Sequence, residues 1–151
     1  MAREALRAHP EVKQLIFVPA GHSPGKKPNL ASGEQRFAWI RATVLPLGFQ
    51  VWDHEVVKGG ESYTVETLET AHAMGANRAR LFWLLGADAY GSFPTWRKPE
   101  KIRALCRLLV VNRPGKKIPL LDPEDLFLEI PPHPASSSAL RTRLQIGRAH
   151  V

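Results

Sequence analysis

Apolar runs of strand length alternate with helical patterns along most of this chain. The runs over Gln14–Val18, Leu81–Leu85 and Leu108–Val111 are apolar at nearly every position rather than at every second one. Strands of this kind are typical of a parallel sheet that is covered by helices on both faces. The pattern therefore predicts an α/β fold, a Rossmann-like doubly wound parallel sheet in a single domain.

Capping and breaking residues set the other boundaries. Ser32 and Gln35 have the spacing of a capping box, which begins a helix, and Gly75 ends another helix. The remaining expected elements are helices over Ala2–Ala8, Tyr63–Met74, Pro99–Ala104 and Ser138–Leu144, and strands over Phe49–Trp52 and Phe127–Ile130.

The composition limits which kinds of ligand or partner the protein is expected to bind. The formal net charge is +7, which fits either a solvated basic surface or a site for anionic ligands. The basic residues are spread along the chain without a stripe of stacking aromatics, so we expect no nucleic-acid partner. No apolar run reaches membrane-spanning length, and we expect no membrane partner. The single cysteine, Cys106, lies in an apolar run, so we expect a buried, inert thiol and a cytoplasmic protein.

Ligands of a doubly wound sheet bind beyond the carboxyl ends of its strands. The loops after Val18, Leu85 and Val111 then share one rim, and they hold Lys26, the pair Gly86 and Asp88, and Arg113. The Asp88 carboxylate either caps the next helix or accepts hydrogen bonds from a ribose or adenine. Arg113 is either a solvated strand end or a planar, permanently charged fork for phosphate. Lys26 lies in a loop rich in Gly, Pro and Lys, whose composition alone is typical of a surface loop with solvated lysines.

Two further segments each allow a structural role and a ligand-binding role. Tyr63 and Thr64 follow Ser62 at a predicted helix start, where hydroxyls cap helices and free backbone N–H groups bind anions. Trp96 ends a Phe-Pro-Thr-Trp segment in a Gly- and Pro-rich connection, and its flat indole can stack on an aromatic ligand. Phe93, in the same segment, is expected to pack in the core.

In order along the chain, five segments resemble bacterial nicotinate-mononucleotide adenylyltransferases of the nucleotidyltransferase superfamily. The segments are Ser62–Leu68, Gly86–Asp88, Phe93–Trp96, Arg113–Gly115 and Ser136–Arg141, and the resemblance spans Ala2 to Leu144. It implies transfer of AMP from ATP to nicotinate mononucleotide, giving deamido-NAD and pyrophosphate in NAD biosynthesis. The alternatives are another acceptor, such as nicotinamide mononucleotide or a pantetheine phosphate, and a non-catalytic nucleotide-binding module. Trp96 and the Tyr63–Thr64 turn favour a pyridine nucleotide.

The resemblance also assigns roles to residues. It implies catalytic roles for Lys26 and Arg141 on the triphosphate, whose phosphates bind Mg²⁺, and no metal ligand from the protein. The implied ATP-binding residues are Gly86, Asp88, Arg113, Ser137, Ser138 and Arg141, and the implied mononucleotide-binding residues are Tyr63, Thr64, Trp96 and Arg97. Gly25 stands where the family usually has a histidine.

The two ends of the chain differ from the resembled family. The family's first, central strand and its His-x-Gly-His motif are absent from the 151 residues. We expect a partial nucleotidyltransferase domain over residues 1–145, with little activity as it stands. Residues Ile146–Val151 match the translation of a common sequencing adapter, so we expect a non-native tail there.

Overall fold

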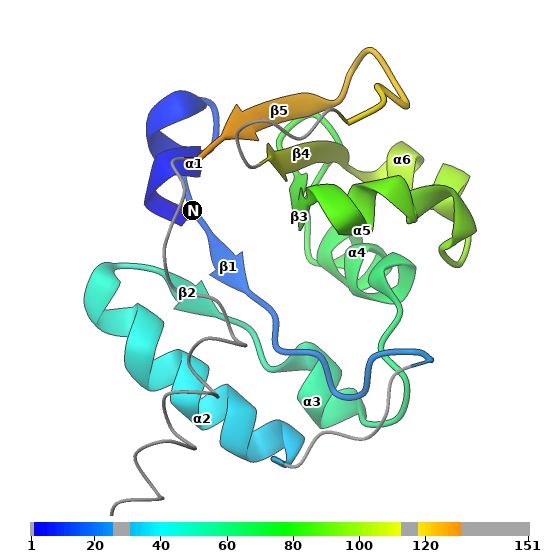
Figure 1. Ribbon diagram of the computed structural model, residues 1–151. Helices are drawn as coiled ribbons and strands as arrows, with labels where there is room; N and C mark the ends of the chain where they lie inside the picture. Colours follow the sequence, from blue (N-terminus) through cyan, green and yellow to red (C-terminus); the bar gives the residue numbers. More distant parts are fainter. Residues whose placement is uncertain (1, 26–30, 113–117, 131–151) are drawn as a thin grey trace, which may run out of the picture.

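Helices and parallel strands alternate in the computed structural model, which describes residues 2–25, 31–112 and 118–130 (Figure 1). The helices are α1 (Ala2–Ala8), α2 (Gly33–Val44), α3 (His54–Lys58), α4 (Thr64–Ala73), α5 (Ala87–Gly91) and α6 (Pro99–Leu105), with 3-10 turns η1 (Leu45–Leu47) and η2 (Phe93–Thr95). The strands are β1 (Ile16–Phe17), β2 (Gln50–Val51), β3 (Phe82–Gly86), β4 (Arg107–Asn112) and β5 (Leu126–Glu129). The predicted helix over Ser138–Leu144 lies outside the described residues.

All of these strands pair in parallel, as a doubly wound fold requires. β3, β4 and β5 form one sheet in that order, so β5 is an edge strand as expected, while β1 and β2 form a second sheet. Every pairing is parallel, which confirms the predicted α/β class. The described strands thus form two parallel sheets, which is consistent with a Rossmann-like fold.

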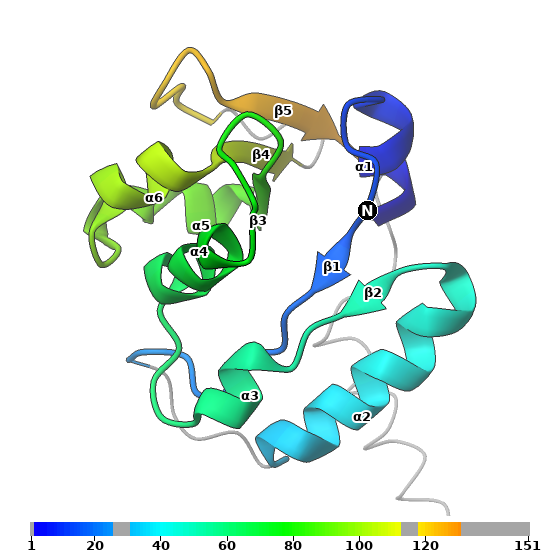
Figure 2. The ribbon, with the colours of Figure 1, turned by 180° about the vertical axis from the view of Figure 1, so that it is seen from behind.

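Strand β4 is apolar throughout because both of its faces are covered. Leu108 and Val110 pack with α4, α5, η2 and α6, whereas Leu109 and Val111 pack on the opposite face with α1 and β5. Successive side chains of a strand point to opposite faces, so a strand that is covered twice has no polar face. Figures 1 and 2 show the two coverings from opposite sides, with α1 at one end and α4 and α6 at the other.

The first predicted strand is shorter and less buried than expected. Only Ile16 and Phe17 are in β1, and the Ile16 side chain is 49% exposed. The expectation of a buried strand over Gln14–Val18 is therefore wrong. Among the described residues, β1 pairs only with β2, which is equally short. The apolar side chains of β1 are therefore not fully covered by neighbouring elements.

Helix boundaries follow the local rules closely. The Ser32 hydroxyl accepts from the Gln35 N–H at 3.1 Å, and the Gln35 side chain accepts from the Ser32 N–H at 3.0 Å, which is the predicted capping box. Gly75 follows α4 with φ of +98°, a conformation that favours glycine. The helices α3 and α5 were not predicted, because five residues are too few to show a helical period. None of the helices in the described part of the chain combines the length and apolar character needed to cross a membrane.

Candidate functional site

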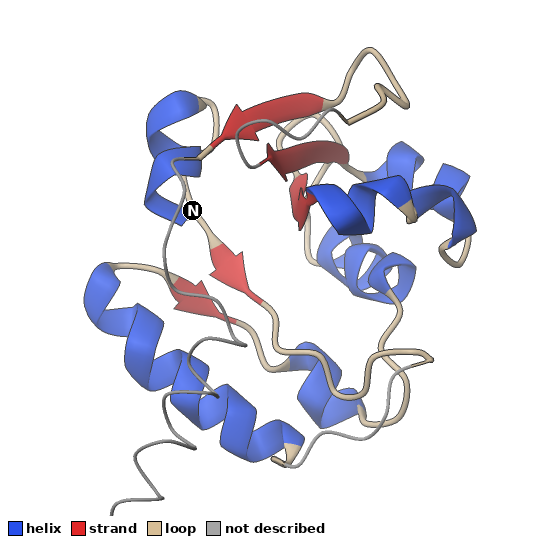
Figure 3. Ribbon diagram, in the orientation of Figure 1, coloured by secondary structure: helices blue, strands red, loops and turns tan. Residues whose placement is uncertain are grey.

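The loop after β1 is fastened to the turn that precedes α4. The Gly21 N–H donates to Ser62 Oγ at 2.9 Å, and the Ser62 N–H donates to the His22 carbonyl at 2.8 Å. The Arg36 guanidinium donates to the Gly21 carbonyl at 2.6 Å, which ties α2 to the same point. Figure 3 shows this loop running past α3 toward the connection that leads into α4. A strand-end loop and a helix N-terminus therefore meet here.

Gly21 is needed in this junction because no side chain fits. A Cβ at this position would overlap the Glu55 carbonyl oxygen and would lie 3.2 Å from Ser62 Oγ. Glu55 itself is buried, and its carboxylate accepts from the Thr67 hydroxyl at 2.6 Å, which holds α3 against α4. The close approach of α3 thus fixes where the loop can run.

The N-terminus of α4 faces this junction with its backbone. Tyr63 is the N-cap and makes no side-chain capping hydrogen bond, and Thr64 is the first helical residue. Ser62 does not cap the helix, because its hydroxyl accepts from Gly21, so the capping alternative is wrong for this residue. The first N–H groups of a helix and its dipole together favour an anion at such an end.

The structure brings the predicted tryptophan turn to the same helix end. The Arg97 guanidinium carbon lies 4.4 Å from the centre of the Tyr63 ring, a cation–π contact. Trp96 is half-buried, with its ring 5.6 Å from that of Phe93 and its Nε1–H donating to Ser92 Oγ at 3.4 Å. Phe93 is only 2% exposed, which confirms its predicted role in packing. The predicted mononucleotide-binding residues Tyr63, Thr64, Trp96 and Arg97 are therefore neighbours.

Charged groups surround the Tyr63 ring. The Tyr63 hydroxyl donates to Glu61 Oε2 at 2.5 Å, and this bond to a carboxylate raises the pKa of Tyr63 above its usual value. Lys58 pairs with Glu66 and also donates to the Glu61 carbonyl at 3.0 Å. Sequence reasoning missed Lys58 and Glu66 as members of the site. Glu66 lies in the segment that was singled out, and an acidic residue in a first helical turn was the available clue.

Gly86 and Asp88 lie at the carboxyl end of β3. Gly86 is the N-cap of α5, and Asp88 is in its first turn. Both residues are exposed. The N-cap position of α5 is thus Gly86 rather than Asp88, and the charge of Asp88 suits the positive end of the helix. The structure places both residues on the rim where a nucleotide is expected.

The other predicted phosphate-binding residues lie outside the described residues. They are Lys26, Arg113, Ser137, Ser138 and Arg141. The tail Ile146–Val151 lies there as well.

Polar groups elsewhere in the described residues serve packing. The buried Tyr90 donates to Asp125 Oδ2 at 2.6 Å, and Arg103 donates to both oxygens of Asp125 at 2.9 and 3.1 Å. Cys106 is buried, as expected, and burial raises the pKa of its thiol to about 12. His72 bonds the Leu105 carbonyl at 2.7 Å. Among the residues that the structure describes, no group of three or more His, Cys, Asp or Glu side chains is placed to hold a metal ion.

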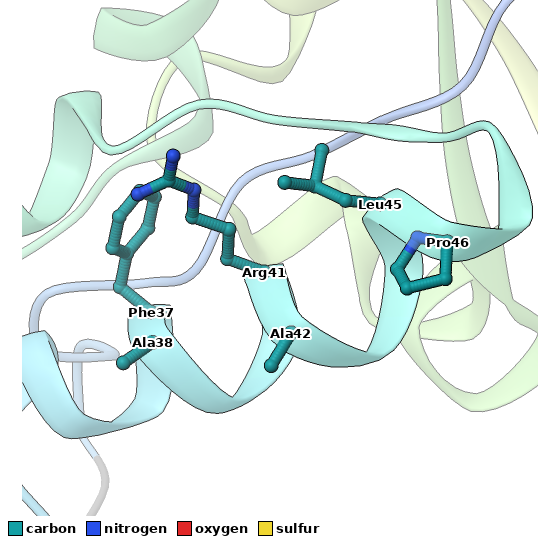
Figure 4. A pocket seen from close by; sticks show the side chains of 6 residues that line it. All are labelled: Phe37, Ala38, Arg41, Ala42, Leu45 and Pro46. Carbon is teal, nitrogen blue, oxygen red and sulfur yellow. The ribbon is translucent and has the colours of Figure 1, made fainter.

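A shallow hollow of about 510 Å³ lies on one side of α2, and none of its lining residues belongs to the group around Tyr63 (Figure 4). Its lining residues are Phe37, Ala38, Arg41, Ala42, Leu45 and Pro46. None of them is among the site residues expected from the sequence.

Comparison with known proteins places the chain in a family. Residues 1–143 match the family model described as cytidylyltransferase-like. A probable nicotinate-nucleotide adenylyltransferase of Bordetella avium (strain 197N) is 34% identical over 159 residues, which covers 98% of this chain and 78% of the relative. Another protein of that name, from Roseiflexus sp. (strain RS-1), is 33% identical and covers 96% of this chain and 77% of the relative. The chain therefore belongs to the cytidylyltransferase-like family and, within it, to the nicotinate-nucleotide adenylyltransferases.

Proposed function

We propose that this protein transfers AMP from ATP to nicotinate mononucleotide, giving deamido-NAD and pyrophosphate. The observation that carries the proposal is the contact between Arg97 and Tyr63, in which the guanidinium carbon lies 4.4 Å from the centre of the ring. The contact brings the Trp96 turn to the N-terminus of α4. The Trp96 indole and the first backbone N–H groups of α4 can then bind the same ligand. A pyridine ring with a carboxylate matches that pair of surfaces. The names of the relatives support the same acceptor.

Each part of the acceptor then has a partner. The nicotinate ring stacks on the Trp96 indole, a contact worth about 1–3 kcal/mol by analogy with base stacking. The nicotinate carboxylate accepts from backbone N–H groups at Thr64 and Arg97, where the α4 dipole favours an anion. An amide in place of the carboxylate gains less from a positive site, so we favour the acid over nicotinamide mononucleotide.

The reaction needs alignment more than a base. A phosphate monoester is largely ionised at neutral pH, so its oxygen attacks the α-phosphorus of ATP directly. One phosphorus–oxygen bond forms to the mononucleotide phosphate, and the bond to the β-phosphate oxygen breaks as pyrophosphate leaves. Catalysis then rests on holding the two phosphates in line and on neutralising the departing charge.

Residues at the triphosphate end complete the proposal. Asp88 receives the ribose or adenine at the end of β3, and Lys26, Arg113, Ser137, Ser138 and Arg141 receive the phosphates. Mg²⁺ enters as the MgATP substrate, bound by the phosphate oxygens. We place this reaction in the cytoplasm, where a protein with a single buried cysteine stays reduced.

The test is product analysis with matched acceptors. Purified chain is incubated with MgATP and either nicotinate mononucleotide, nicotinamide mononucleotide or phosphopantetheine, and the dinucleotide or dephospho-coenzyme product is quantified by mass spectrometry. We expect deamido-NAD above the level of any other product. Turnover should be slow, because removal of one charge-stabilising donor costs about 100–1000-fold and the His-x-Gly-His motif is absent from the 151 residues. A product from another acceptor alone, or none from a chain that shows no binding of nicotinate mononucleotide, would contradict the proposal.

A further inference from the structure

Glu66 connects two segments that meet at the proposed mononucleotide site. Its Oε1 lies 3.7 Å from Arg97 Nη1, and its Oε2 pairs with Lys58 Nζ. Arg97 belongs to the turn after η2, and Lys58 is the last residue of α3. The Glu66 side chain is 30% exposed, so solvent weakens these ion pairs only partly. One carboxylate thus fixes cations from both sides of the α4 N-terminus.

The turn that carries Trp96 needs such an anchor. Lys98 has a φ of 54°, and it is the only non-glycine residue with positive φ in the described part of the chain. A lysine gains nothing in this region of backbone space, so the surroundings of the turn must impose the conformation. The contacts of the neighbouring Arg97 with Tyr63 and Glu66 are part of those surroundings.

We infer that Glu66 is a positioning residue for nicotinate mononucleotide. It holds the Arg97 guanidinium over the Tyr63 ring, and through Arg97 it sets the distance between the Trp96 indole and the first N–H groups of α4. The effect on the acceptor rests on the proposed function, whereas the effect on Arg97 does not. In the proposed function ATP binds at the end of β3 and beyond, so its affinity should not depend on Glu66.

A plainer role for Glu66 would be to stabilise α4. An acidic side chain in the first turn favours any helix through the dipole, without reference to a ligand. Glu69 offers a control for the loss of one carboxylate and its ion pair from α4, because it lies one turn further along the helix and pairs with Lys101 in a comparable exposed ion pair. It lies beyond the first turn, so the dipole role is tested by the Arg97 shift, which a dipole effect alone would leave in place. Glu66→Gln and Glu69→Gln remove the same charge from the same helix, and only the first removes the anchor of Arg97.

The experiment compares the two variants with the unaltered chain by isothermal titration and by NMR. Titration gives the Kd of nicotinate mononucleotide and of MgATP. NMR follows the Arg97 side-chain protons, which the Tyr63 ring shifts upfield as long as the guanidinium lies over it. We expect Glu66→Gln to weaken nicotinate mononucleotide binding by about five- to tenfold, as suits the loss of one partly buried charge contact and its cation–π partner. The upfield shift should disappear in this variant, and MgATP affinity should change by less than about twofold.

Each outcome has a distinct meaning. Glu69→Gln should leave both affinities within about twofold and the Arg97 shift in place. If the two variants lose mononucleotide affinity equally, or if the Arg97 shift survives in Glu66→Gln, the inference is overturned. If the unaltered chain binds no nicotinate mononucleotide while Glu66→Gln still abolishes the shift, the proposed function has failed and the positioning of Arg97 by Glu66 stands.

Discussion

The Arg97 guanidinium lies over the ring of Tyr63, with 4.4 Å between the guanidinium carbon and the ring centre. This contact joins the turn after η2 to the N-cap of α4, two segments that are distant in sequence. Both segments are held from behind as well, the turn by Phe93 in the core and the helix end by the Gly21–Ser62 junction. The proposed acceptor site is therefore built on supported elements rather than on free loops.

Replacing Trp96 with alanine should separate the two substrates. Loss of the stacking surface should raise the KM for nicotinate mononucleotide by about 5- to 150-fold, the equivalent of 1–3 kcal/mol, with little change in the KM for ATP. Steady-state kinetics or titration measures both values. Trp39→Ala is the control, because Trp39 is 61% exposed on α2 and should have no effect on either substrate. Equal losses for both substrates in Trp96→Ala would contradict the assignment.

Replacing Gly21 with alanine should destabilise the fold near the site. The new Cβ would overlap the Glu55 carbonyl, so α3 or the loop after β1 must shift, at a cost of about 1–3 kcal/mol. Urea unfolding followed by circular dichroism gives the free energy. Gly91→Ala is the matched control, since nothing lies within 4 Å of a Cβ there and stability should not fall. An unchanged unfolding midpoint in Gly21→Ala would show that the junction is loose.

Removing the Tyr90 hydroxyl should cost stability below alkaline pH. It donates to Asp125 and accepts from the Leu121 N–H at 2.7 Å, so Tyr90→Phe leaves buried groups unpaired, at a cost of about 1–3 kcal/mol. Burial and, secondarily, the bond to Asp125 raise the pKa of Tyr90. The neutral hydroxyl is thus favoured in the folded state, and its contribution is complete below pH of about 10 and lost as the pH rises through the folded pKa.

The check is the unfolding free energy of the two proteins as a function of pH. Tyr63→Phe, which removes an exposed hydroxyl, should change stability by less than about 0.5 kcal/mol at neutral pH. If the difference between the unaltered chain and Tyr90→Phe grew toward high pH, the sign of the shift would be wrong.

The Cys106 thiol should be unreactive as long as the chain is folded. Burial raises the pKa of this thiol to about 12, so the folded chain at pH 8 holds almost no thiolate at this position. Unfolded thiols ionise near pH 8.5, and stability should therefore fall as the pH rises between about 9 and 12. Iodoacetamide should label the protein only in denaturant, as measured by mass spectrometry. Rapid labelling in buffer alone would mean that the packing around α6 and β4 opens readily.

Sequence predicted the elements whose determinants are local. The capping box of Ser32 and Gln35, the end of α4 at Gly75 and the start of α6 at Pro99 depend on neighbours along the chain, and all three are confirmed. The apolar pattern of β4 also predicted a strand covered on both faces. By contrast, the exposure of Ile16 depends on what lies beside β1, which no local pattern reports.

The candidate site shows the same division. Trp96 could be singled out because a flat indole suits an aromatic ligand, and Tyr63 and Thr64 because their segment resembles the mononucleotide-binding turn of the family. Lys58 and Glu66 could not, because their roles come from α3, α4 and the turn after η2 meeting in space. The same is true of Gly21, whose need for glycine comes from the approach of α3 rather than from its own backbone angles.

An NMR titration with nicotinate mononucleotide tests the central claim most directly. Amide shifts of the isotopically labelled chain locate the ligand without requiring turnover. We expect saturable shifts at the amides of Thr64 and Arg97 and at the indole N–H of Trp96, with weaker binding of nicotinamide mononucleotide at the same residues. Saturable shifts confined to α2, or no shifts in a chain that shows the dispersed spectrum of a folded protein, would contradict it.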